Sequence, residues 1–313
     1  MYFPYLHGKE GELKALKSVA ALLGTPQRIF PILEPVRSIK ALERAVFTDF
    51  ATANAQLYVI TNPSQGQLAD LAALAQWQSD FSSWLASPVV RPTLLILPTT
   101  PLGEVSAFAT TYPSQPVGVV VRSSTLSAAD VKTALGGANA LIFVYATATP
   151  NAYVNAFGAG SVVVVRDAFN AQDKNASYSG IETFDDDHAT YAAAGRPGFS
   201  DFTPMPPRMN SGGGGPAAAI ALHMSFRDSG DINVQHFVSD STTQGDGTNS
   251  TKFLEALDHL AEQVRVTPTR FDSSPGLDEF LTLHRDRRAT NGAGYKAWQT
   301  SHHIITIARE LGI

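Results

Sequence analysis

The feature that most constrains this fold is a repeated alternation of short apolar runs with stretches of helical spacing. Six runs are apolar or rich in β-branched residues, which is typical of strands covered on both faces. Between them, apolar side chains recur at intervals of about three to four residues, as in amphipathic helices. This alternation predicts parallel strands joined by helical crossovers. The predicted strands are residues 29–36, 56–62, 93–98, 117–122, 140–145 and 162–167.

Helix-end signals support this pattern. Ser38 and Ser127 each precede a helical stretch and can cap its first turn, and Gly136 ends the second of these helices. Two further predicted strands, residues 217–226 and 232–240, bring the count to eight. Eight strands favour an α/β barrel of the TIM type, (β/α)8, over a doubly wound sheet.

The last two predicted strands depart from this pattern. Only residues 227–231 separate them, too few for a crossover helix, so we expect an antiparallel hairpin. Whether this hairpin modifies the barrel or closes it differently stays open. If Ser229 and Gly230 form the turn, His223 lies directly opposite His236. Two imidazoles there could bind a metal or a phosphate, or act as acid and base; a structural, hydrogen-bonded pair is the alternative.

A long irregular segment, residues 168–215, precedes the hairpin and is rich in Asn, Asp, Gly and Pro. Such a loop is often a lid or a binding surface, and a tolerated insertion is the alternative. Helical stretches follow the hairpin within residues 250–313. Since no repeat or linker is evident, we predict a single barrel-like domain over residues 1–313, with an insertion at 168–215 and C-terminal helices.

Composition excludes several classes of protein. The 313 residues include no cysteine, which rules out disulfides, thiolate metal sites and a cysteine nucleophile. A net charge of −5 argues against a broad nucleic-acid-binding surface. No apolar run approaches the roughly 20 residues that span a bilayer. The first residues lack the pattern of a signal peptide, so we expect a cytoplasmic protein without a membrane partner.

Polar residues at the ends of the predicted strands are the first candidates for a site, because barrel enzymes place their chemistry at the carboxyl ends of their strands. Glu34 is a candidate catalytic carboxylate. Arg122 and Arg166 suit an anionic substrate, and Tyr145 is a third candidate substrate-binding residue. The alternative for each position is an ordinary polar strand end at the surface.

A divalent metal is a possible cofactor. Asp167, His223 and His236 offer the carboxylate and imidazole ligands that such ions prefer. Asp187 and His188 at the start of a short helical stretch are candidate catalytic residues, although acidic residues are also common as helix caps there. Asp201, between Phe199 and Phe202, is another candidate; anchoring of the long loop is its alternative role.

Several of these residues lie in segments that resemble the bacterial and phage "beta protein" family, over nearly the whole chain. His7 departs from the family pattern, which has arginine there. The segments are Tyr2-Phe3-Pro4-Tyr5-Leu6-His7-Gly8-Lys9 with Glu12-Leu13, Ile32-Leu33-Glu34-Pro35-Val36, Asp187-His188 with Tyr191, Gly198-Phe199-Ser200-Asp201-Phe202, His223, and His236-Phe237-Val238-Ser239-Asp240.

The resemblance implies a barrel protein without an assigned activity. Some members of the family occur beside nuclease-like proteins in mobile or phage-defence gene neighbourhoods, which implies a possible partner of that kind. The family-like polar positions are Glu34, Asp187, His188, Asp201, His223, His236 and Asp240.

Two functions from different classes follow. The first is a metal-assisted hydrolase that acts on an anionic, phosphate- or nucleotide-like substrate at the carboxyl ends of the strands. The second is a non-catalytic binding module that partners a nuclease-like protein, for which phage defence is a candidate setting. In the second case the two histidines are structural.

Overall fold

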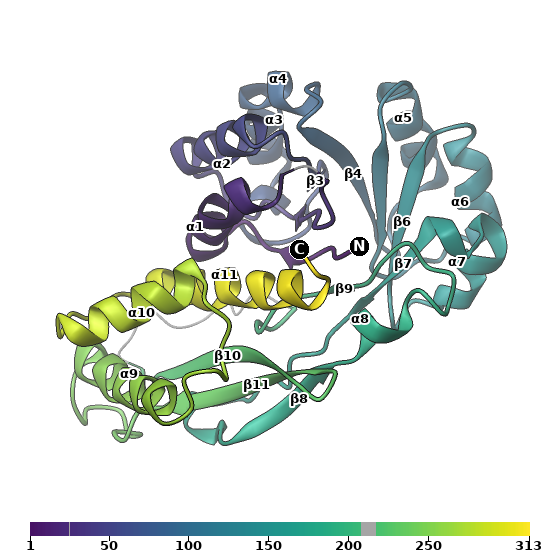
Figure 1. Cartoon of the computed structure of the whole chain (residues 1–313). Helices are drawn as coiled ribbons and strands as arrows, with labels where there is room; N and C mark the ends of the chain where they lie inside the picture. The colour runs from purple at the N-terminus through teal and green to yellow at the C-terminus, as the bar shows by residue number, and fades with distance from the viewer. Residues whose placement is uncertain (25, 208–216) are drawn as a thin grey trace. The chain divides into compact units, whose positions relative to one another are not determined.

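Eight short parallel strands form a nearly closed barrel in the computed structural model, which describes residues 1–24, 26–207 and 217–313 (Figure 1). A bridge between Tyr2 and Phe199 brings the first strand beside the last. The predicted (β/α)8 fold of the TIM type is therefore confirmed. In order around the sheet, the strands are β1 (Tyr5–Leu6), β2 (Ile32–Leu33), β3 (Leu57–Ile60), β4 (Val90–Ile96), β5 (Val117–Val121), β6 (Ala140–Tyr145), β7 (Val162–Arg166) and β9 (Ser200–Asp201).

Helices alternate with these strands and cover the outer face of the sheet (Figure 1). Ser127 accepts a hydrogen bond from the N–H of Asp130 and Gly136 ends the helix, as predicted. Ser38 does not cap its helix; the Glu43 carboxylate instead accepts the N–H of Ile39 at 2.8 Å. The helices are α2 (Lys40–Thr52), α3 (Leu71–Asp80), α4 (Ser82–Leu85), α5 (Leu102–Thr111), α6 (Ala128–Leu135), α7 (Pro150–Phe157) and α8 (Asp187–Thr190).

The interior of the barrel is filled with side chains that alternate along each strand with outward-facing residues. On β5, Val119 and Val121 face the helices, whereas Val120 belongs to the interior cluster. Gly118 leaves room for a neighbour, because a Cβ there would lie 2.7 Å from the ring of Tyr58. The interior cluster comprises Phe3, Tyr5, Phe30, Ile32, Tyr58, Ile60, Leu95, Val120, Phe143, Val163, Val165 and Phe202.

The hairpin forms as predicted but lies in a different sheet. Strands β10 (Ala221–Asp228) and β11 (Asp231–Val238) are antiparallel, with His223 opposite His236. Strand β11 also pairs with β8 (Ile181–Asp185), which gives a separate three-stranded sheet of order β10-β11-β8. Counting the hairpin among the eight barrel strands was therefore wrong. The two remaining barrel strands are instead β1 and β9, which have only two residues each.

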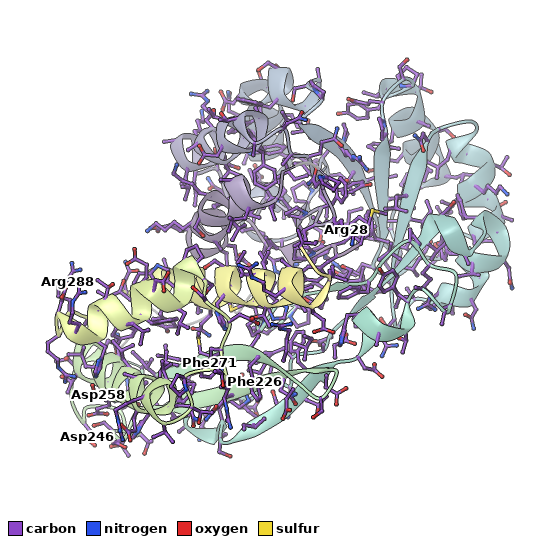
Figure 2. The ribbon with its side chains drawn as sticks, viewed as in Figure 1. Arg28, Phe226, Asp246, Asp258, Phe271 and Arg288 are labelled. Atoms are coloured by element: carbon purple, nitrogen blue, oxygen red, sulfur yellow. The ribbon has the colours of Figure 1, made fainter. Side chains whose placement is uncertain are left out.

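Helices pack on this three-stranded sheet. The side chains of Ile220, Leu222 and Met224 contact apolar residues of α9 (Asn249–Val266) and α10 (Pro275–Arg285). Phe226 and Phe271 meet edge to face, with ring centroids 5.9 Å apart (Figure 2). The C-terminal helices predicted within residues 250–313 are thus present, and they end with α11 (Gly292–Glu310).

The chain divides into two compact units where the sequence predicted one domain. The barrel unit comprises Met1–Gly8, Ala20–Asp167 and Asp187–Phe202. The second unit comprises Lys9–Val19, Ala168–Asp186 and the described part of Thr203–Ile313. Helix α1 (Glu10–Val19) belongs to the second unit, where it packs against α11.

The predicted insertion at residues 168–215 is shared between these units. Its described residues include β8, α8 and β9, so it contributes a strand to each sheet. Residues 208–215, with their glycine run, lie outside the described part of the chain. Within the described residues, no helix has the length and apolar character that crossing a membrane requires.

Candidate functional site

Glu34 lies at the carboxyl end of β2, where it is fully buried. It follows Ile32, which belongs to the interior cluster, so strand alternation directs Glu34 inward too. Its Oε2 accepts a hydrogen bond from the Tyr5 hydroxyl at 2.7 Å and from Arg122 Nη2 at 2.5 Å. Its Oε1 accepts the backbone N–H of Ser64 at 3.2 Å. The carboxylate is thus held by three segments of the barrel.

Arg122 reaches the same point from the end of β5. Besides Glu34, its guanidinium donates to Ser64 Oγ at 2.7 Å, to the Tyr5 hydroxyl at 3.2 Å and to the Tyr145 hydroxyl at 3.3 Å. A guanidinium has five N–H donors, and these contacts use four. The second N–H on Nη1 has no partner among the described residues, and 21% of the side chain is exposed.

We call the group formed by Tyr5, Glu34, Ser64, Arg122 and Tyr145 the barrel mouth. Glu34, Arg122 and Tyr145 were predicted from the sequence, and the structure brings them together. Tyr5 and Ser64 were missed. A tyrosine within an apolar start and a serine in a loop carry no signal of their own, because their role comes only from barrel closure.

His7 also contacts the mouth, and Gln65 and Phe202 contact His7 in turn. The His7 imidazole is buried, and its Nε2 lies 3.8 Å from Glu34 Oε2 and 3.2 Å from Gln65 Nε2. Its ring lies parallel to that of Phe202, with centroids 6.1 Å apart. The position of His7 directly after β1, at a carboxyl end, is the signal that could have found it.

The electrostatics of the mouth favour an ionised carboxylate and neutral phenols. Burial alone would raise the pKa of Glu34, but Arg122, His7, the Tyr5 hydroxyl and the Ser64 N–H together lower it below its ordinary value. Burial and the charge of Glu34 raise the pKa of Tyr5 well above its usual range. The pKa of Tyr145 is also raised, chiefly by burial. The Glu34 carboxylate therefore anchors Arg122 and is a weak base.

Other predicted residues gather outside the barrel. Val165 faces the interior, so Arg166 at the end of β7 faces outward, where its Nε lies 2.6 Å from Asp187 Oδ2 on α8. Asp201 ends β9 and accepts a hydrogen bond from the Tyr2 hydroxyl at 2.8 Å. His188 packs edge to face against Phe199. Arg166, Asp187, His188 and Asp201 thus lie on β7, α8 and β9 and make contacts other than those of the barrel mouth.

His223 and His236 form a buried pair in the second unit. Their Nδ1 atoms are 2.8 Å apart, a hydrogen-bond distance, whereas two nitrogens on one zinc ion would be about 3.3 Å apart at the usual bond lengths. Burial lowers the pKa of His223 well below its ordinary value, and burial also lowers that of His236 against the opposing effect of Glu182. The rings of Phe169 and Tyr178 pack against the pair.

Asp167, the third predicted metal ligand, is exposed and belongs to the barrel unit, whereas the two histidines belong to the second unit. The pairing of His223 with His236 was predictable because hairpin register follows from turn length. Asp167 was chosen as a polar residue at the end of a predicted barrel strand, and that position gave no information about its distance from the hairpin.

Comparison with known proteins adds no relative. No family model matches the chain, and no curated protein matches it. The resemblance to the "beta protein" family stays a prediction, and a function for the chain is inferred below from the geometry of the site.

Proposed function

We propose that the barrel mouth binds a phosphate-bearing anion and promotes hydrolysis of its ester bond. The observation that carries this proposal is the state of Arg122. Its guanidinium is fixed by four hydrogen bonds, keeps one N–H free of described partners and retains contact with solvent. A cation held in this way is organised before the ligand arrives, so binding costs little side-chain entropy.

The same residues suit a hydrolytic step. Arg122 would hold a phosphoryl oxygen, and Glu34 and Ser64 would keep the guanidinium in place. Water attacks phosphorus and gives its proton to His7, which must be in its neutral form for this step, while the bond from phosphorus to the leaving oxygen breaks. Tyr145, which burial keeps protonated by raising its pKa, donates its proton to that oxygen, and the phenolate then regains a proton from His7 through solvent, which restores both groups.

Turnover of generic substrates tests this proposal. Initial rates with p-nitrophenyl phosphate and bis(p-nitrophenyl) phosphate would be measured for wild type, Arg122→Met and Arg91→Met. Arg91 is the matched control, because it also faces the barrel interior but lies at the start of β4, where the amino ends of the strands meet. Turnover lost only in Arg122→Met supports the proposal, whereas equal turnover in all three contradicts it.

Metal assistance is a separate part of the proposal, since Asp167, His223 and His236 do not come from one unit. Elemental analysis of protein purified without metal-affinity resin tests it. One equivalent of zinc, manganese or iron, lost in the double variant His223→Ala/His236→Ala, would support a metal at these histidines. No metal after incubation with these ions would remove it from the proposal.

We also propose, as the second candidate, a non-catalytic module that binds a nuclease-like protein. The hydrogen bond between His223 and His236 favours it, because a self-satisfied pair fits a structural role. Replacing both histidines with alanine should then lower the melting temperature without loss of a ligand. Co-purification of a stoichiometric partner from the native host would support this candidate, and an isolated protein with turnover would refute it.

A further inference from the structure

The imidazole of His302, on α11, connects this helix to β10 and to the start of α10. Its Nε2 lies 2.8 Å from the backbone oxygen of Ser225 on β10. Its Nδ1 lies 2.7 Å from the hydroxyl oxygen of Ser274, the residue that caps the N-terminus of α10. All three residues are buried and belong to the second unit. One side chain thus links three elements of this unit through two hydrogen bonds.

These two partners fix the protonation state of His302. A backbone carbonyl can only accept a hydrogen bond, so Nε2 carries a proton. Ser274 Oγ accepts the backbone N–H of Leu277 at 3.1 Å as the helix cap, and its own hydrogen is left to donate. Nδ1 accepts that hydrogen only when it carries no proton itself. The hydrogen bonds of the closed arrangement therefore require the neutral imidazole.

A second proton on the ring would disrupt this arrangement. Nδ1 would change from an acceptor to a donor, so the buried Ser274 hydroxyl would lose the acceptor of its hydrogen. The new positive charge would also lie at the N-terminus of α10, which is the positive end of the helix dipole. In agreement with this geometry, burial lowers the pKa of His302 from its ordinary value of 6.5 to about 4.

The charged groups around His302 do not reverse this preference. Helix α11 packs against α1, α10 and β10. Asp272, which precedes α10, favours the imidazolium, but it is paired with Arg227 of β10 at 2.7 Å. His303, the next residue of α11, disfavours the imidazolium, and its own Nδ1 lies 2.7 Å from Ser225 Oγ. The charged residues of α1, all of them described, do not contribute to the shift.

We propose that His302 is a pH-sensitive switch that releases the first turn of α10 when the solution becomes mildly acidic. In the open form the imidazole meets water and regains its ordinary affinity for a proton, so acid favours opening. The ratio of open to closed forms should rise by up to about tenfold for each pH unit below 6.5, and level off near the folded-state pKa of about 4. This inference concerns the second unit and does not depend on the proposed function.

Amide hydrogen exchange of the folded full chain, measured residue by residue by NMR, tests the switch. Leu277 N–H is bonded to the cap, so its exchange rate is the open fraction multiplied by the intrinsic rate, provided that reclosing is fast. As pH falls, the intrinsic rate decreases in proportion to hydroxide while the open fraction should increase in proportion to the proton. We therefore expect a nearly constant rate for Leu277 between about pH 6 and about pH 4.5. The capped N–H of Asp130 on α6 should slow with hydroxide.

Two variants isolate the imidazole. His302→Gln keeps an N–H for the carbonyl on β10 but does not titrate in this range, so exchange of Leu277 should slow in proportion to hydroxide. Ser274→Asp keeps a helix cap and places a carboxylate beside the imidazolium, so protonation no longer favours opening and the same slowing is expected. His259→Gln is the matched control, because His259 is an exposed histidine of the same unit, and it should behave as wild type.

Two results would overturn the switch. The first is an exchange rate of Leu277 in wild type that falls in proportion to hydroxide. The second is a nearly constant rate that persists in His302→Gln, which would assign the pH dependence to another group. If His302→Gln does not fold, Ser274→Asp decides the second point in the same way.

Discussion

The two ends of the barrel interior each hold an arginine, and they hold it differently. At the carboxyl end, Arg122 meets the buried carboxylate of Glu34 at 2.5 Å. At the amino end, Arg91 donates to the Gln56 side-chain oxygen and the Tyr58 hydroxyl and stacks on Phe30, and no described carboxylate pairs with it. One arginine is thus part of a charge pair and the other is solvated by neutral groups.

The two arginines therefore differ in role: Arg122 belongs to a candidate binding site, whereas Arg91 packs between aromatic rings. Glu34 is fully buried, so its charge depends on Arg122, and the pair together with two phenols forms a fixed polar network. Arg91 fills space between aromatic rings and leaves no charge dependent on it. The same kind of substitution should therefore change the stability of the protein by different amounts at the two ends.

Removing each guanidinium is expected to give the largest difference in unfolding free energy between the two ends. Arg122→Met leaves the Glu34 charge buried without its partner, and breaking such a pair costs about 3 kcal/mol of unfolding free energy. Arg91→Met removes hydrogen bonds to neutral groups only, at about 1 kcal/mol. Urea denaturation measures both. Equal losses would mean that the charge pair does not stabilise the mouth. If Arg122→Met does not fold, Arg122→Lys tests the same pair with the charge retained.

A substitution at Gly118, midway along β5, should disturb the amino end of the barrel and leave the carboxyl end unchanged. Gly118→Ala would place a Cβ 2.6 Å from Thr93 Oγ1 and 2.7 Å from the ring of Tyr58, whose hydroxyl binds Arg91. We expect a loss of about 2 kcal/mol from overpacking, with phosphate affinity at the mouth unchanged. Gly103→Ala is the control, because nothing lies within 4 Å of its Cβ position. Loss of phosphate affinity in Gly118→Ala would show that the ends are coupled.

These two arginines also illustrate what sequence could and could not predict. Arg122 was predicted because it ends the apolar run of β5, and the barrel places such ends together. Arg91 was not, because it starts a strand and no rule assigns chemistry there. The barrel was predictable from the alternation, but β1 and β9 were not, since two paired residues leave no periodic signal. Tertiary closure creates both these strands and the contacts of Tyr5 and Ser64.

Removing one tyrosine hydroxyl at each end should give a smaller difference in unfolding free energy. Tyr5→Phe deletes a donor to the Glu34 carboxylate and an acceptor for Arg122, which costs about 2 kcal/mol. Tyr58→Phe deletes one acceptor for the partly exposed Arg91, at about 1 kcal/mol. Thermal or urea unfolding of the two variants gives the comparison. A larger loss in Tyr58→Phe would reverse the ranking of the two ends.

The smallest expected effect is a difference in acid sensitivity. The pKa of Glu34 is lower in the folded chain than its ordinary value of 4.5, so its contribution to stability is present above that value and is lost as pH falls through the folded pKa. Unfolding free energies of Glu34→Gln should therefore fall less steeply below about pH 4.5 than those of wild type. Arg91→Met should keep the wild-type slope. Identical slopes in all three proteins would contradict a lowered pKa at the mouth.

The measurement that tests the account most directly is calorimetric titration of inorganic phosphate into wild type, Arg122→Met and Arg91→Met, each first shown to be folded by circular dichroism. If the barrel mouth is the anion site, wild type and Arg91→Met bind phosphate with similar affinity and Arg122→Met does not bind it. Equal affinity in all three proteins, or binding lost only in Arg91→Met, would contradict the assignment of the barrel mouth as the anion site.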